Sequence, residues 1–120
     1  MSRPLVVVGD ALLDVDVVGS ASRLSPDAPV PVIDDVETRE RPGGAALAAV
    51  IAAAATDRAV VLVAPLADDD GATRLAALLE GRVTLLPVPA QGATAVKRRV
   101  RIGDLAVARL DSGGPAAAPG

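Results

Sequence analysis

Two uninterrupted apolar runs, separated by a strongly helix-forming segment, constrain the fold of this 120-residue chain most strongly. The runs are Leu5–Val8 (LVVV) and Ala59–Ala64 (AVVLVA). Strands that are apolar at every position are typical of parallel sheets covered on both faces. The segment between them, residues 45–57 (AALAAVIAAAATD), is rich in alanine and favours a helix. Buried strands that alternate with helices indicate an α/β layer.

Each expected helix has an apolar face. In the first helix this face is Leu47, Val50, Ile51 and Ala54. The second helix begins after the acidic run Asp68–Asp70, whose negative charge suits a helix N-terminus, and Gly81 is its expected C-terminal stop. Its apolar face is Leu75, Leu78 and Leu79. Residues 82–88 (RVTLLPV) then predict a further strand.

The segment SRLSPDAPVPV, residues 22–32, contains three prolines and ends in a strand-like alternation. Alternate residues of a strand direct their N–H groups to opposite edges. Pro29 and Pro31 therefore remove donors from one edge, whereas Val30 and Val32 can pair on the other. This pattern predicts an edge strand within residues 28–37, beside a weaker strand at residues 15–19.

Residues 95–111 (AVKRRVRIGDLAVARLD) predict a β-hairpin with Gly103-Asp104 as a two-residue turn. On its first strand Lys97, Arg99 and Arg101 share one face. These alternating strands do not fit the parallel layer, and they predict a second, small sheet that covers the first as a lid. We expect residues 1–111 to form the folded segment and residues 112–120 (SGGPAAAPG, after Asp111) to form a linker-like tail.

The composition excludes several classes of site. The chain has no Phe, Tyr or Trp, so its core must consist of Val, Leu, Ile and Ala. It has no Cys and no His, which excludes disulfides, thiolate metal sites and a histidine base. A net charge of -3 gives no general attraction to nucleic acid or anionic membranes. The apolar run near the start of the sequence, which ends before Asp10, is too short for a signal peptide or a membrane span, and we expect a cytoplasmic protein.

Two features at predicted strand ends have a functional and a structural interpretation. Gly43-Gly44 before the first helix can form an anion or sugar-hydroxyl site, or simply a tight turn. Asp10 and Asp14 follow the first buried strand, where open α/β sheets bind ligands, but they can equally be capping or turn residues. Neither a dinucleotide-binding glycine pattern nor a P-loop occurs in the sequence.

Two charged runs are also ambiguous. The basic run KRRVR (residues 97–101) suits a phosphate on a small substrate, RNA, or a solvated strand face. RNA is the weakest of these, since single-strand binders use aromatic side chains that this chain lacks. The acidic run DDDG (residues 68–71) lacks the ligand spacing of a calcium loop and favours a solvated helix start.

Taken together, six strings resemble the sugar kinases of the ribokinase (PfkB) family. They are VVVGDALLD, SRLSPDAPVPV, ERPGGAALA, LADDDGA, TAVKRRV and ARLD, and they extend from Leu5 to about Asp111. SPDAPVPV followed by RPGGAA is most similar to the kinase domain of the bifunctional ADP-heptose synthases. The resemblance implies a ribokinase-like α/β fold whose small β-sheet closes over the sugar and joins two subunits in a homodimer.

The resemblance also implies an activity and a set of binding residues. Kinases of this branch transfer the γ-phosphate of ATP, with Mg²⁺, to C1 of D-glycero-β-D-manno-heptose 7-phosphate. Asp14 matches the family aspartate that binds sugar hydroxyls, and Gly43 and Gly44 match the glycine pair beneath the sugar. Lys97 and Arg99 fall where these kinases offer basic side chains to a substrate phosphate.

The sequence departs from the family pattern in two places. Leu47 stands where the pattern has a sugar-binding asparagine. The family's Gly-Ala-Gly-Asp motif, which supplies the anion hole and the catalytic aspartate, does not occur, so we assign no catalytic residue to this chain. We expect the N-terminal, sugar-binding part of a kinase that is inactive alone and binds neither ATP nor Mg²⁺ by itself. The alternative is a non-catalytic paralogue that only dimerises through its lid.

Overall fold

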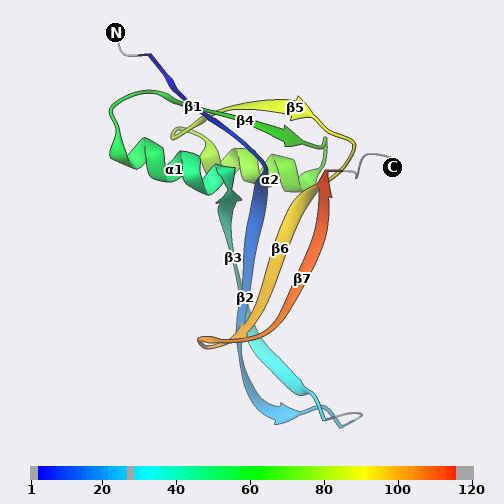
Figure 1. The fold of residues 1–120 in the computed structure, drawn as a ribbon. Helices are drawn as coiled ribbons and strands as arrows, with labels where there is room; N and C mark the ends of the chain where they lie inside the picture. The colour runs from blue at the N-terminus through cyan, green and yellow to red at the C-terminus, as the bar shows by residue number, and fades with distance from the viewer. Residues whose placement is uncertain (1–2, 27–28, 116–120) are drawn as a thin grey trace.

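The computed structural model describes residues 3–26 and 29–115. It contains a three-stranded sheet in the order β1-β4-β5 and a four-stranded sheet in the order β3-β2-β6-β7 (Figure 1). The predicted second sheet is present, but it projects from the first sheet instead of covering it (Figure 1); we call it the lid sheet. The strands are β1 (Leu5–Val8), β2 (Ala11–Leu24), β3 (Pro31–Gly44), β4 (Val60–Leu66), β5 (Thr84–Pro89), β6 (Gly92–Ile102) and β7 (Leu105–Pro115), and the helices are α1 (Ala45–Ala55) and α2 (Asp70–Leu79).

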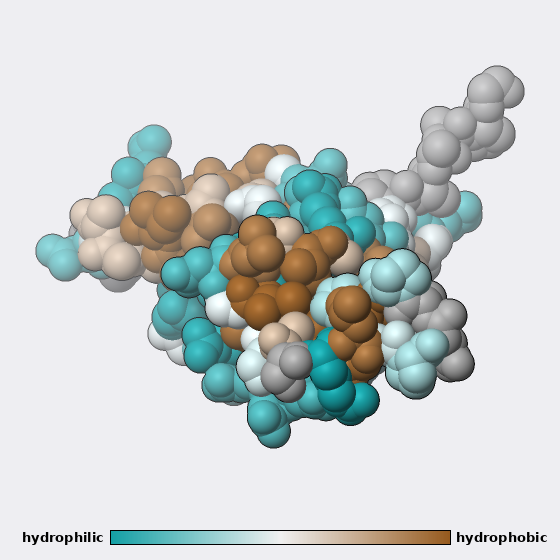
Figure 2. All heavy atoms as spheres, turned by 90° about the horizontal axis from the view of Figure 1, so that it is seen from below, coloured by the Kyte–Doolittle hydropathy of each residue, from teal (hydrophilic) through white to brown (hydrophobic). Residues whose placement is uncertain are grey.

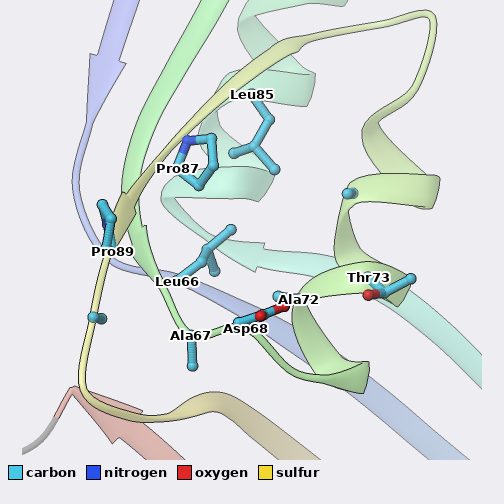
Figure 3. A pocket seen from close by; sticks show the side chains of 10 residues that line it. Leu66, Ala67, Asp68, Ala72, Thr73, Leu85, Pro87 and Pro89 are labelled. Carbon is cyan, nitrogen blue, oxygen red and sulfur yellow. The ribbon is translucent and has the colours of Figure 1, made fainter.

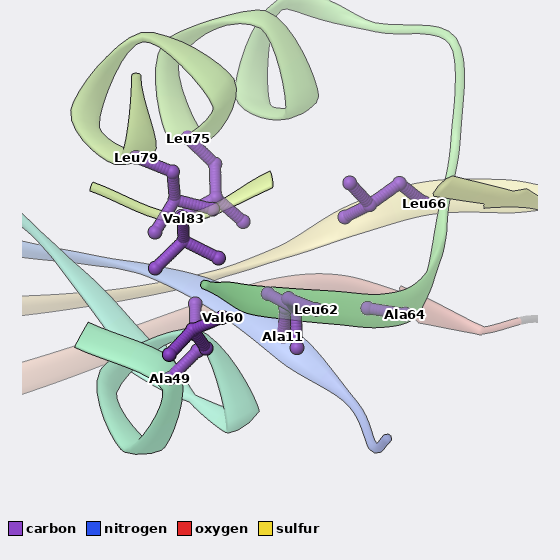
Figure 4. Packing of buried hydrophobic residues seen from close by; sticks show 10 residues of the cluster. Ala11, Ala49, Val60, Leu62, Ala64, Leu66, Leu75, Leu79 and Val83 are labelled. Atoms are coloured by element: carbon purple, nitrogen blue, oxygen red, sulfur yellow. The ribbon is translucent and has the colours of Figure 1, made fainter. Parts of the chain in front are cut away.

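The first sheet is parallel throughout, as predicted, and both helices pack on one of its faces. Side chains alternate along β4, so every second residue points into the core between sheet and helices. Leu62 and the α2 residues Leu75 and Leu79 are the largest fully buried side chains. Figure 4 shows this core. Its buried residues are Ala11, Ala46, Ala49, Val60, Leu62, Ala64, Leu66, Leu75, Leu79 and Val83.

The prediction for the apolar face of α1 is wrong for Leu47 and Ile51, whereas the predicted residue Val50 is partly buried against the core. Ala46 and Ala49 are fully buried against the sheet, whereas Leu47 and Ile51 are 45% and 60% exposed. Alanine lets the helix axis approach the sheet closely, and the larger side chains then point away from it. On α2, by contrast, the predicted residues Leu75 and Leu79 are the buried ones.

The face of the parallel sheet opposite the helices is uncovered in the described part of the chain. Val6 and Val8 on β1 are 52% and 74% exposed, and Leu86 and Val88 on β5 are also exposed. The uniform apolarity of LVVV predicts cover on both faces, and the structure provides it on one only. An apolar sheet face of this kind favours association with other apolar surfaces.

The outer edge of β5 is deficient in hydrogen-bond donors. The backbone N–H of Ala90 donates to the carbonyl of Leu66 on β4 at 3.1 Å, so the alternate positions Leu85, Pro87 and Pro89 face the free edge. Two of those three residues are prolines without an N–H group. This edge is therefore protected against pairing with a further strand.

The lid sheet is built on β2, which pairs antiparallel with β3 and parallel with β6. Among the described strands, β3 has β2 as its only neighbour, which confirms the predicted edge strand. Pro31 begins β3 opposite Leu24, and just outside the sheet the carbonyl of Val30 accepts a hydrogen bond from the backbone N–H of Ser25 at 2.8 Å. Ala28 of the predicted strand lies outside the described residues.

The predicted hairpin is confirmed, and its second strand is longer than expected. β6 and β7 join through Gly103-Asp104, with Gly103 at φ 58°, as a two-residue turn with glycine first requires. β7 continues to Pro115, and Ser112, Gly114 and Pro115 of the predicted tail pair with β6. Residues 116–120 of the predicted tail lie outside the described residues.

Candidate functional site

A pocket of about 520 Å³ lies between α1 and the charged face of the lid sheet. Apolar side chains of α1 form one wall, and aspartate and arginine side chains of the lid form the other. Its lining residues are Asp14, Arg41, Pro42, Leu47, Val50, Arg82, Arg99 and Arg101. We call this the Asp14 pocket.

The strand register explains why charged groups meet there. Asp14 on β2 lies opposite Arg41 on β3 and beside Lys97 on β6. Neighbours in register share a face of a sheet, and every second residue returns to that face. Asp16 therefore joins Asp14, and Arg99 and Arg101 join Lys97, on the same side of the lid.

Asp14 is held between two neighbours. Arg99 donates from Nη1 to Oδ1 of Asp14 at 3.0 Å, and both side chains are partly buried. A β-carbon placed on Gly43 would overlap Oδ2 of Asp14 and the side chain of Leu12. Only glycine leaves room for the carboxylate at this position. The structure thus brings together three of the predicted site residues, Asp14, Gly43 and Arg99.

Gly44 forms the turn from β3 into α1. Its φ is 60°, and a β-carbon there would come within 2.6 Å of the carbonyl oxygen of Asp10. The same carbonyl accepts a hydrogen bond from the backbone N–H of Ala45 at 2.8 Å. Asp10 thus contributes its backbone to the turn, and the N–H of Ala45 already has a partner. The structure therefore supports the interpretation of Gly44 as a tight-turn residue, and this turn lies next to the Asp14 pocket.

The sequence analysis missed a second ion-pair cluster beside Asp14. Asp16 is 9% exposed and accepts from Nη2 of Arg41 at 2.5 Å and from Nε of Arg101 at 3.4 Å. The alternation of Asp14 with Asp16 and of Arg99 with Arg101 is visible in the sequence. What the sequence could not show is that Arg41 on β3 faces the same pair of aspartates.

Lys97 differs from Arg99 in its surroundings. It is half-buried and lies in register between Asp14 and Asp111, but it does not line the Asp14 pocket. Arg109 donates hydrogen bonds to Asp111 and lowers the pKa of that carboxyl, with smaller contributions from the charges of Lys97 and Arg99. Of the two predicted phosphate-binding residues, the pocket contains Arg99 only.

The Asp14 pocket has an excess of positive charge. Four arginines line it, and Asp14 and Asp16 provide two negative charges against them. Two positive charges are left over, which is close to the charge that a phosphate monoester neutralises at pH 7. Guanidinium groups also bind phosphate oxygens in a bidentate manner. The arrangement suits a ligand that has both hydroxyl groups and a phosphate.

A second cavity, of about 420 Å³, lies between α2 and β5 and is mainly apolar. Figure 3 shows Leu66, Leu85 and Pro87 around it, with Asp68 and Thr73 on the α2 side. It contains none of the predicted site residues and a single ionisable side chain. A sugar needs several polar partners, and the Asp14 pocket provides more of them than this apolar cavity does. We therefore take the Asp14 pocket as the candidate site.

The residues of the Asp14 pocket do not fit a magnesium site. Mg²⁺ prefers carboxylate and other oxygen ligands, and the carboxylates of Asp14 and Asp16 are already paired with arginines. Within residues 3–26 and 29–115, no three Asp, Glu, His or Cys side chains are grouped so that they could hold a metal ion. Over the same described ranges, no helix is long and apolar enough to cross a membrane.

Comparison with known proteins gives clear relatives by sequence. The chain is 51% identical over 111 residues to the bifunctional protein HldE of Streptomyces coelicolor, which covers 92% of this chain and 24% of that protein. It is 38% identical over 113 residues to HldE of Azorhizobium caulinodans, covering 91% of this chain and 23% of that protein. The chain thus spans about a quarter of the length of these relatives. No protein-family model matches it.

Solved structures with a similar fold are carbohydrate kinases. A carbohydrate kinase from Agrobacterium tumefaciens aligns with a TM-score of 0.71 at 19% identity, over 92% of this chain and 36% of that one. Phosphofructokinase-2 from Escherichia coli, solved in complex with fructose-6-phosphate, aligns with a TM-score of 0.62 at 15% identity, over 91% and 34%. The resemblance to the ribokinase-like carbohydrate kinases is confirmed.

The ribokinase-like fold accounts for both sheets of this chain. The parallel sheet with its helices and the mixed lid sheet correspond together to about a third of each solved kinase. Three of the sequence relatives, at 38–51% identity, are bifunctional HldE proteins. The binding roles of Asp14, Gly43, Gly44, Lys97 and Arg99 stay predictions.

Proposed function

We propose that the Asp14 pocket binds a phosphorylated heptose, and that this chain is the sugar-binding and lid segment of a carbohydrate kinase. The proposed substrate is D-glycero-β-D-manno-heptose 7-phosphate, phosphorylated at C1. The observation that supports the proposal most is the presence, in one pocket, of an oriented carboxylate and two excess positive charges. Sequence identity to HldE supports the choice of heptose among sugars.

In the proposed complex, the carboxylate of Asp14 accepts hydrogen bonds from sugar hydroxyls. Arg99 occupies Oδ1 of Asp14, so Oδ2, which lies against Gly43, is the oxygen nearer to a ligand on the glycine side. A carboxylate that is fixed before binding loses little further freedom when the sugar arrives. Gly43 contributes by leaving space, because any side chain there would displace the carboxylate.

The phosphate of the sugar is bound by arginines of the lid. Arg99 and Arg101 on β6 and Arg41 on β3 line the pocket from two strands that flank β2. Lys97 adds positive charge on the same face without lining the pocket, and we assign it a longer-range electrostatic contribution. A charge excess of this kind favours a sugar phosphate over a neutral sugar.

ATP and Mg²⁺ belong to the proposed complete kinase, in which ATP supplies the transferred phosphoryl group. The solved fructokinase from Xylella fastidiosa, 21% identical to this chain, was obtained with bound ATP. The residues of this chain bind the sugar, orient it, and exclude water when the lid covers it. This positioning is a large part of catalysis in phosphoryl transfer.

A second candidate function is association through the lid without catalysis. Figure 2, which views the molecule from the lid end, shows hydrophobic side chains gathered among hydrophilic ones. The exposed large hydrophobic residues of the lid strands are Leu24, Val36, Leu105, Val107 and Leu110. These residues favour a homodimer, which is compatible with sugar binding, and they also suit a chain that only dimerises.

Calorimetric titration distinguishes the two candidates. We expect heptose 7-phosphate to bind the 120-residue chain at least about tenfold more tightly than heptose without phosphate. A single charge-assisted hydrogen bond to the phosphate is enough to give this difference in affinity. Inorganic phosphate serves as the control for a nonspecific anion. Sedimentation on the same samples reports the oligomeric state. If the chain forms dimers and binds neither sugar, the result would contradict the proposed sugar-binding function and support association through the lid.

A further inference from the structure

The acidic run at the start of α2 contains one residue whose contacts differ from those of its neighbours. Asp69 is the N-cap residue of α2, and its Oδ1 accepts from the backbone N–H of Ala72 at 2.9 Å. Its Oδ2 accepts from the backbone N–H of Thr94 on β6 at 2.7 Å. One carboxylate therefore joins the helix start to a strand of the lid. The interpretation of this run as a solvated helix start does not hold for Asp69.

Thr94 occupies a special place in β6. The register of β6 against β7 shifts between Ala93 and Val96, which leaves Thr94 in a bulge, and pairing of β6 with β2 begins only at Val96. The backbone N–H of a bulged residue lacks its regular partner in the ladder. Asp69 supplies that partner, at the point where β6 passes from the body of the molecule into the lid.

The hydroxyl of Thr94 completes this junction. Thr94 is 5% exposed, and its Oγ1 accepts from the backbone N–H of Ala67, in the loop between β4 and α2. The methyl and β-carbon of Thr94 lie close to Gly71, in the first turn of α2. The loop that carries Asp69 thus holds Thr94 through backbone and side chain together.

A second contact joins α2 to the lid. Arg74, one turn after Asp69, forms an ion pair with Glu40 on β3 and donates from Nε to Oε2 at 3.1 Å. Glu40 lies on the lid face opposite to the Asp14 pocket, next to Arg41 in sequence. The first turns of α2 therefore contact β6 and β3, the two strands that carry three of the four arginines of the pocket.

We propose that Asp69 is a positioning residue, which anchors β6 at Thr94 and so sets where Arg99 and Arg101 stand relative to Asp14. Arg99 lies five residues beyond the anchor on the same strand, and its contact with Asp14 depends on the register and the direction of β6. Without the anchor, the bulge at Thr94 becomes a point about which the lid strand can move. The effect of Asp69 on sugar binding rests on the proposed function. Its effect on how rigidly β6 is held in the lid sheet does not depend on that function.

The chain offers a matched set of variants. In Asp69→Asn the amide oxygen can still cap α2, since Asn is as good an N-cap residue as Asp, but its NH₂ cannot accept from Thr94. Asp69→Ser keeps a cap and is too short to reach β6, so it serves as the second variant. Asp70→Asn is the control, because it makes the same change in charge one residue away, at a side chain that is 83% exposed.

Amide hydrogen exchange of the 120-residue chain tests the anchor without any ligand. We expect Asp69→Asn and Asp69→Ser to raise exchange at Thr94 and through Val96–Arg99 by about tenfold or more, the loss expected for a bond to a charged acceptor. The amides of Leu75 and Leu79 in α2 should stay within about twofold, and Asp70→Asn should change neither group. Equal acceleration in α2 and β6, or no change at Thr94, would overturn the proposal.

Titration with heptose 7-phosphate gives the second readout. We expect Asp69→Asn to weaken binding by about five- to tenfold at unchanged stoichiometry, with Asp70→Asn within about twofold of the parent. Faster exchange in the lid with unaltered affinity would contradict the positioning role. If the parent chain itself does not bind the sugar, the proposed function fails, and the exchange comparison alone then decides whether Asp69 anchors the lid.

Discussion

Arg99 pairs with Asp14 and not with its own neighbour in register. Its partner in the ladder is Asp16, yet its guanidinium reaches back along β2 to Oδ1 of Asp14 at 3.0 Å. Asp16 is left to Arg41 and Arg101. With Arg99 bound to its Oδ1, the Asp14 carboxylate has its Oδ2 against Gly43. Arg41, Arg99 and Arg101 all lie at the pocket as a result.

The first prediction concerns Asp14. Asp14→Ala removes the acceptor for sugar hydroxyls and leaves Arg99 without its partner, so we expect binding of heptose 7-phosphate to weaken by about 1.5–3 kcal/mol, or about 10- to 150-fold. Calorimetry measures the loss. Asp34→Ala is the control, because Asp34 has an exposed ion pair with Arg23 far along β2. If Asp14→Ala binds heptose 7-phosphate within threefold of the parent affinity, Asp14 has a structural role and does not bind the sugar.

The second prediction concerns Leu47. It lines the pocket and is 45% exposed, so Leu47→Asn adds a hydrogen-bonding group at little cost to packing. We expect heptose 7-phosphate to bind more tightly by about 0.5–1.5 kcal/mol, or about 2- to 10-fold. Ile51→Asn, one turn further on the same exposed face, should change nothing. Unchanged or weaker binding in a folded Leu47→Asn variant would point to a different substrate.

The third prediction separates Arg99 from Lys97. Arg99→Gln should reduce the affinity for phosphorylated heptose far more than that for heptose, since Arg99 lines the pocket. Lys97→Gln should have the smaller effect of a charge that acts at longer range. Arg98→Gln, on the opposite face of β6, is the matched control. Equal losses for both sugars would favour a solvated strand face without a phosphate-binding role.

The fourth prediction concerns the uncovered sheet face. Val6, Val8, Leu86 and Val88 present a hydrophobic surface opposite the helices, so we expect the 120-residue chain to self-associate in solution. Replacing Val8, 74% exposed, by Lys should lower the mass measured by light scattering. Val36→Lys tests the lid in the same way. A monodisperse monomer in the parent chain would show that this face does not drive association.

The fifth prediction is a pH dependence of stability. Hydrogen bonds from the backbone of Thr94 and Ala72 lower the pKa of Asp69 below its usual value. A carboxyl with a lowered pKa stabilises the fold above the unfolded pKa of about 4, and that stabilisation is lost as the pH falls through the folded value. Urea unfolding should therefore show the parent more stable than Asp69→Asn at pH 6, with the difference shrinking below about pH 4. A difference that is independent of pH would exclude this linkage.

The sequence predicted the elements well where one physical cause dominates. The apolar runs of β1 and β4, the prolines before β3 and the turn at Gly103 each specify a strand or a turn locally. The face of α1 was mispredicted because close packing against a sheet favours Ala46 and Ala49 over the larger Leu47 and Ile51. Hydrophobicity alone does not report how near a helix must approach.

The candidate site was predictable in part. Asp14 and Gly43 followed from the family resemblance, and the structure brings them into contact. The roles of Asp16 and Arg41 depend on the register of β2 against β3, which shifts at two irregularities, between Val18 and Ser20 and between Ala21 and Arg23. The contact between Asp69 and Thr94 depends on a bulge in β6, which no local pattern in the sequence reveals.

The most direct test of the sugar-phosphate pocket is to map the ligand on the chain itself. In ¹H–¹⁵N spectra of the 120-residue chain, heptose 7-phosphate should shift the backbone amides of Gly43 and Gly44 and the side-chain Nε–H of Arg99 and Arg101, saturably and together. The amides of Ala72 and Ala90, which line the apolar cavity beside β5, should stay in place. Shifts confined to that cavity, or no saturable shifts at Gly43 and Arg99, would contradict the account.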